Sequence, residues 1–163
     1  MKQPVHISLA RTATKPPAEL VRSNAFLLGR LGMQLKTHKL EAFEAAGENP
    51  YHHAVLCVLD ESARETQATI ADALGYDRSW LVGLLDELEA DGLLERRRDP
   101  ADRRRHLVSL KPEGKAKLAE LRTISKRVEE EFLAPLDAGQ RSELHDLLLE
   151  LAAYHDPRYA PKG

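Results

Sequence analysis

Six arginines lie within the ten residues 96–105, and they are the side chains of this chain best suited to a defined chemistry, the binding of phosphate. A guanidinium group is always charged and can form two parallel hydrogen bonds with phosphate oxygens. Residues 95–111 contain seven cationic and three anionic side chains, a local balance of +4, whereas the whole chain has −2. A basic stretch can also be a solvated surface. The element that precedes the arginines decides between phosphate binding and a solvated surface.

Residues 66–92 have the pattern of two short helices joined by a tight turn. Thr66 can cap the start of the first helix, Gly75 can take the positive φ that ends it, and Asp77 can cap the second. One face of the second helix is apolar, with an i, i+3, i+4, i+7 spacing at Leu81, Leu84, Leu85 and Leu88. Gly92 ends this helix.

The other side chains of the second helix are left to solvent or to a ligand: Arg78, Ser79, Val82 and Gly83. Trp80 is also off the leucine stripe, where it could contact a base or a thymine methyl group, or pack against the first helix. Beyond Arg78 the helix is acidic, so we expect little base recognition there and a C-terminal half that points away from phosphates.

The arginines themselves lie in a predicted strand–turn–strand. A strand opens at Leu93 and Leu94, Asp99–Asp102 form a turn with Pro100 at its favoured position, and residues 107–110 return. This order of elements is that of a winged helix-turn-helix, which fits one helix to the major groove and a cationic loop to phosphates or the minor groove. In this context the arginines are predicted to contact DNA.

The sequence resembles the MarR family of bacterial transcription regulators over roughly residues 20–155. The resemblance is carried by D-R-S at 77–79, E-L-E-A-D-G-L at 87–93 and D-P-A-D-R-R-R-H-L-V-S-L at 99–110. The family's D-x-R at the wing tip matches Asp102-Arg103-Arg104. The resemblance implies that Arg104 enters the minor groove while Asp102 helps to hold the wing. It also implies a homodimer whose DNA affinity is lowered by a small molecule or a redox signal.

The flanking regions are predicted to be helical. Residues 1–18 are expected to form an N-terminal arm that either touches DNA or is a solvated tail. Residues 50–111 are expected to form the winged helix-turn-helix. Residues 19–49 and 112–157 are expected to be dimerisation helices, with a single helix over 19–46 and a capping box at Asp137 and Gln140.

The terminal helices contain more leucine than one small winged domain can cover. These residues include Leu20, Leu27, Leu28, Leu31, Leu35, Leu144, Leu147, Leu148 and Leu151. Burial against a second copy would give an isologous dimer with two recognition helices about one DNA turn apart. The alternative is that they pack within one chain as a small bundle.

Composition excludes several other classes of protein. The 163 residues contain no apolar run of membrane-spanning length and no signal peptide, so a cytoplasmic protein without a membrane partner is expected. The chain lacks a phosphate-binding glycine loop, a Gly-x-Ser-x-Gly elbow and a His-Glu-x-x-His motif, so we expect neither an enzyme nor a cofactor. The alternative function is a winged-helix protein-interaction module without DNA binding, which has no need of six wing arginines.

The single cysteine and the histidines are the candidate sensor or metal residues. Cys57 has apolar neighbours and is predicted to be a core residue, not an oxidant sensor. Adjacent His52 and His53 diverge by about 100° on a helix, so no metal site is expected. His38 and His53 could instead line the cleft for a small-molecule effector, which the resemblance places between the dimer helices and the winged domain, or be solvated.

The predicted fold is therefore mainly α-helical with a small β-hairpin wing. The predicted function is that of a sequence-specific transcriptional regulator, a repressor by the family's habit, that binds a pseudo-palindromic operator as a homodimer and is released by an effector. The predicted DNA-binding residues are Arg78, Ser79, Trp80, Val82, Gly83, Arg98, Arg103, Arg104 and Arg105.

Overall fold

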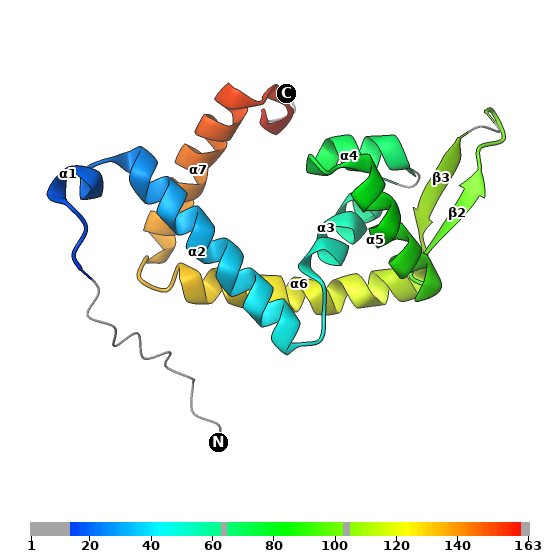
Figure 1. Cartoon of the computed structure of the whole chain (residues 1–163), viewed down its shortest axis with the longest axis horizontal. Coiled ribbons are helices and arrows are strands. Elements are labelled where there is room, and N and C mark those ends of the chain that lie inside the picture. Colours follow the sequence, from blue (N-terminus) through cyan, green and yellow to red (C-terminus); the bar gives the residue numbers. More distant parts are fainter. Residues whose placement is uncertain (1–13, 63–64, 103–104, 161–163) are drawn as a thin grey trace, which may run out of the picture. The chain divides into compact units, whose positions relative to one another are not determined.

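The structure is a computed structural model that describes residues 14–62, 65–102 and 105–160. It is mainly helical with one small antiparallel sheet (Figure 1). The chain forms two compact units that divide between Thr37 and His38. Within the described residues, no helix is both long and apolar enough to span a bilayer.

The first unit contains α1 (Ala18–Val21) and most of α2 (Asn24–Ala45), which continues into the second unit. The prediction of one continuous helix over 19–46 is wrong at Arg22 and Ser23, where a turn separates α1 from α2. Ser23 explains the interruption, because its Oγ accepts a hydrogen bond from the backbone N–H of Phe26 at 3.2 Å. A serine in this position caps a new helix more readily than it continues an old one.

The second unit is built on α3 (Pro50–Glu61), which packs against α4 (Gln67–Leu74), α5 (Arg78–Ala90) and α6 (Pro112–Phe132). Its core is aliphatic apart from Phe43, contributed by the end of α2. The fully buried side chains are Phe43, Val55, Leu56, Ile70, Leu81, Leu85, Leu88, Leu94, Val108, Leu118 and Leu121. The predicted leucine stripe of α5 is thus confirmed as a core face.

The sheet has three strands, β1 (Glu65–Thr66), β2 (Leu94–Arg98) and β3 (His106–Leu110), in the order β1-β3-β2. Leu94 pairs with Leu110 and Arg98 with His106, so β2 and β3 form the predicted hairpin. The prediction of a two-stranded wing missed β1, which pairs with Leu107 and Val108. Two residues are too few to show the alternation by which a strand is recognised.

Helix α6 begins immediately after the wing and is held close to it. Gly114 allows this approach, since a Cβ atom at this position would lie 2.1 Å from the Leu93 carbonyl oxygen. Lys111 precedes α6 without a side-chain cap. After α6, α7 (Ala138–His155) starts with the predicted Asp137–Gln140 capping box, and a short 3-10 turn, η1 (Pro157–Tyr159), follows.

Many leucines of α2 and α7 are solvent-exposed in the single chain. They comprise Leu27, Leu28, Leu31, Leu35 and Leu40 in α2 and Leu147, Leu148 and Leu151 in α7, with Tyr154 beside them. No side chain of α7 is buried.

Candidate nucleic-acid interface

The turn between α4 and α5 has the capping geometry expected from the sequence. Gly75 ends α4 with φ 65°, and Thr66 starts it with a capping box. The Asp77 carboxylate accepts hydrogen bonds from the backbone N–H groups of Ser79 at 2.9 Å and Trp80 at 3.1 Å, and from the Ser79 hydroxyl. These bonds lower the pKa of Asp77 below its usual range, and the bond from the Ser79 hydroxyl has the largest effect. The start of α5 is therefore well ordered by its own residues.

Helix α5 turns a narrow strip of small residues toward solvent. At 100° per residue, Ser79, Gly83 and Ala90 lie within about 40° of one another, opposite the leucines, and the exposed Asp86 borders them about 20° from Ser79. All three are exposed or partly exposed, and a Cβ on Gly83 would have no atom of the protein within 4 Å. Val82 is half-buried and lies nearer the wing. Arg78 is exposed and pairs only loosely with Asp72, at 4.0 Å.

One flank of α5 is covered by α3 and the helix-turn-helix turn. The Trp80 ring makes edge contacts with Tyr51 and Tyr76, each at 4.8 Å between ring centroids, and is 42% exposed. The ring thus packs on α3 and on the turn, whereas the sequence had suggested packing on the first helix or contact with a base, and part of the indole is still accessible. On the same flank, His52 Nε2 lies 2.8 Å from Glu87 Oε2.

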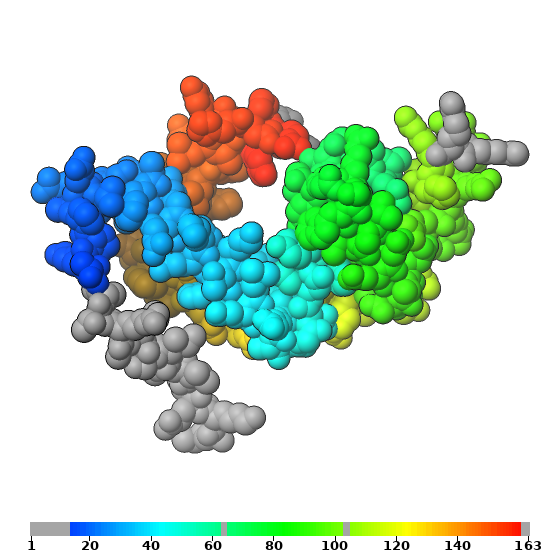
Figure 2. Space-filling model, viewed as in Figure 1, coloured from blue at the N-terminus to red at the C-terminus, as the bar shows by residue number. Residues whose placement is uncertain are grey.

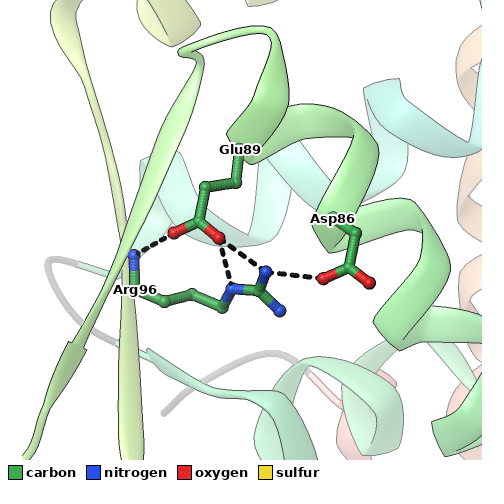
Figure 3. Close-up of polar contacts among 3 residues, drawn as sticks. All are labelled: Asp86, Glu89 and Arg96. Atoms are coloured by element: carbon green, nitrogen blue, oxygen red, sulfur yellow. Dashed lines mark hydrogen bonds and ion pairs between the residues drawn. The ribbon is translucent and has the colours of Figure 1, made fainter.

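The opposite flank of α5 is joined to the wing by Arg96 of β2 (Figure 3). Glu89 accepts hydrogen bonds from the backbone N–H of Arg96 at 3.0 Å, its Nε at 2.9 Å and its Nη2 at 2.5 Å. Asp86 accepts a further bond from Nη2 at 2.5 Å. The bonds from Arg96 lower the pKa of Glu89 and those from Glu89 raise the pKa of Arg96, so this pair is charged at neutral pH.

Several wing arginines besides Arg96 also form ion pairs within the chain. Arg97 pairs with Glu95 at 2.9 Å, and Arg105 with Asp102 at 3.7 Å. Arg98 is exposed and has no ion pair within the described part of the chain. Arg103 and Arg104 lie outside the described residues.

The surfaces of α4 and α5 adjoin that of the wing in the space-filling view (Figure 2). The partner of Arg96 could not be found from spacing, because Glu89 and Arg96 meet only through the packing of α5 on β2. The strip Ser79–Gly83–Ala90 could have been found in part, from its position opposite the leucines.

The two candidate effector residues lie in different surroundings. His38 has its ring 5.7 Å from that of Phe132 and is exposed. His53 is half-buried between Phe43, at 5.9 Å between ring centroids, and Cys57 Sγ, 3.5 Å from its Nε2. Burial, and then the charges of Lys39 and Arg122, lower the pKa of His53.

Neither histidine lines the surface pocket formed by Ala46, Glu48, Glu120, Thr123, Ile124 and Arg127. Neither lines a second pocket, on the wing. Cys57 is half-buried and its pKa is raised, mainly by burial, which does not favour a reactive thiolate. Over the described ranges, no group of three or more His, Cys, Asp or Glu side chains could hold a metal ion.

Comparison with known proteins identifies the family. A MarR family profile matches residues 49–105, from the start of α3 to the wing. The chain is 30% identical over 149 residues to a protein of Thauera aromatica described as a putative transcriptional regulatory protein for the hcr operon; the match covers 86% of this chain and 89% of the relative. The chain belongs to the MarR family. It is therefore a DNA-binding transcriptional regulator and not an enzyme.

Solved structures of MarR-family proteins have the same fold. The repressor CouR, solved bound to a 23-mer DNA duplex, is 30% identical with a TM-score of 0.75, over 86% of this chain and 99% of CouR. PcaV of Streptomyces coelicolor, solved with its natural ligand, is 28% identical with a TM-score of 0.69, over 87% of this chain and 100% of PcaV. MarR of E. coli, at 22% identity and a TM-score of 0.70, shares the fold over 85% of this chain and 98% of its own.

Proposed function

We propose that this regulator represses transcription by binding a pseudo-palindromic operator as a homodimer, with α5 in the major groove. The observation that carries the proposal is the outer strip of α5, whose residues are small and accessible between two covered flanks. Ser79 and Gly83 would face base edges, with Arg78 at the helix start and Val82 and Trp80 at the sides. CouR, which has this fold and was solved bound to a 23-mer DNA duplex, supports double-stranded DNA as the partner.

The wing would supply contacts to the sugar-phosphate backbone beside this groove. Arg98 is the described arginine best placed for this role, because it is exposed and has no ion pair within the described residues. Arg105 would exchange its long contact with Asp102 for a phosphate. Arg103 and Arg104 are proposed from the sequence alone, with Arg104 in the minor groove.

Residues 50–111 would form the DNA-binding domain, and residues 19–49 and 112–157 the dimerisation region. The exposed leucines of α2 and α7 support this division, since apolar surface of this kind is usually covered by a partner. The N-terminal arm, residues 1–18, would add charge near the DNA or remain solvated. It lies largely outside the described residues.

A small-molecule effector would release the DNA, and an anion is the class of effector that the surroundings of His53 favour. Lys39 places positive charge close to a half-buried imidazole that is itself neutral at neutral pH. Arg122 adds to this charge, and it would exchange its ion pair with Asp60, at 2.8 Å, for the anion. PcaV, solved with its natural ligand, supports regulation by a small molecule. Aromatic carboxylates should raise the melting temperature of this protein more than the corresponding neutral amides do.

Selection of DNA from a randomised duplex library tests the proposal. The enriched sequences should contain an inverted repeat with half-site centres about 10 base pairs apart, because two-fold related helices enter successive turns of one groove. Sedimentation of the complex should give two chains per duplex. If no duplex is retained even at low salt, the protein-interaction module is the better account.

A further inference from the structure

We infer that Arg96 is a positioning residue for DNA binding, which keeps the carboxylates of Asp86 and Glu89 away from the phosphates. The inference rests on the proposed placement of α5 in the major groove. In this account Arg96 does not touch the DNA. It acts through Asp86 and Glu89, two side chains of α5, which is the helix that contacts the DNA.

The need for such a residue follows from the charge of α5. Arg78 is its only cation, and Asp86, Glu87 and Glu89 follow. A helix in the major groove has phosphates on both sides, within the distance of about 8–10 Å over which charges interact in physiological salt. Free carboxylates on the flanks of α5 would therefore oppose binding.

The structure accounts for each of these three carboxylates. On the α3 side, Glu87 pairs with His52. On the wing side, Asp86 and Glu89 share the guanidinium of Arg96, and Glu89 is also fixed by the Arg96 backbone N–H. Asp86 lies at the edge of the outer strip, about 20° from Ser79 at 100° per residue, and its bond to Arg96 ties its carboxylate to the wing side. Ser79 and Gly83 are thereby left to approach the base edges.

The surroundings of Arg96 separate it from the other wing arginines. Its side chain is only 20% exposed, whereas that of Arg97, the next residue, is 76% exposed. Alternation along β2 explains this difference, because successive side chains point to opposite faces of the sheet. Nε and Nη2 of Arg96 are already bonded to the two carboxylates, and the low exposure of its side chain limits the access of a phosphate to Nη1.

Two variants and the wild-type protein test the inference on a duplex selected by the wild-type protein. Arg96→Met keeps the aliphatic stem but leaves two carboxylates without their cation, so affinity should fall by about tenfold or more. Adding Asp86→Asn and Glu89→Gln to Arg96→Met removes the repulsion, and affinity should return to within about threefold of wild type. Circular dichroism melts establish that each variant is folded.

A triple variant that is folded but binds as weakly as Arg96→Met would overturn the inference, because Arg96 would then contact DNA itself. Wild-type affinity of Arg96→Met would overturn it as well. If the variants without Arg96 do not fold, a double variant that retains Arg96, Asp86→Asn with Glu89→Gln, is measured instead. Binding at least as tight as that of wild type supports the inference, and weaker binding rejects it. Failure of the selection itself would instead count against the proposed function.

Discussion

At the scale of single residues, the most informative position is Gly83, at the centre of the outer strip of α5. A Cβ there would meet no atom of the protein, so larger side chains fit the free chain. Gly83→Ala should raise the free energy of unfolding by about 1 kcal/mol, because alanine favours the helix interior. Gly83→Leu should fold equally well but bind the selected duplex about tenfold or more weakly, because leucine would occupy space next to base edges.

Urea unfolding and DNA titration of the two Gly83 variants check this prediction. Unchanged affinity of the leucine variant would show that this side of α5 does not face the bases.

His53 should make the stability of the protein depend on pH. Its pKa is lowered in the folded state, by burial and by two nearby cations, so the unfolded chain takes up a proton at higher pH than the folded one. The stabilising contribution of neutral His53 is complete above its unfolded pKa of about 6.5 and is lost as pH falls toward the folded pKa. His53→Gln should therefore lose less stability than wild type between about pH 7 and pH 5.

The control for His53 is His38→Gln, which removes an exposed histidine, and the measurement is urea unfolding at both pH values. Equal pH dependence in wild type and His53→Gln would rule out this role of His53.

At the scale of elements, the junction of the wing with α6 depends on Gly114. A methyl group there would be 2.1 Å from a backbone oxygen of Leu93 and 2.6 Å from Cδ1 of Leu110. Only the leucine side chain can move easily, so Gly114→Ala should cost about 1–3 kcal/mol of stability by overpacking. Gly139→Ala, near the start of α7, is the control, since its closest new neighbour would lie at an ordinary 3.4 Å. Thermal melts showing equal stability of the two variants would mean that α6 is free to shift.

The elements also show how far the sequence could be interpreted. Caps at Thr66, Gly75, Asp77 and Asp137 depend on residues a few positions apart, and all were predicted correctly. Strand β1 and the break at Ser23 were missed, because two residues carry no periodicity and a single serine is compatible with a helix. The Arg96 cluster was missed because it forms only when α5 packs on β2.

At the scale of the whole molecule, the exposed leucines predict a dimer. Leu147→Asp together with Leu151→Asp would bury unpaired carboxylates in the interface, so the dimer should dissociate or the chain unfold. Glu150→Asp, a change at an exposed position of the same helix, is the control and should leave the dimer intact. Sedimentation at micromolar concentration measures both. A wild-type protein that is a stable monomer would contradict the proposed dimer.

The central claim is that α5 selects the sequence while the wing provides much of the affinity. The most direct measurement is the affinity of wild type and Arg104→Ala for the selected duplex at several salt concentrations. We expect the variant to bind more weakly than wild type. In a plot of log affinity against log salt concentration, its slope should be smaller by about one for each phosphate that the variant no longer neutralises. Unchanged affinity and slope for Arg104→Ala, with much weaker binding on deletion of residues 1–15, would contradict the account.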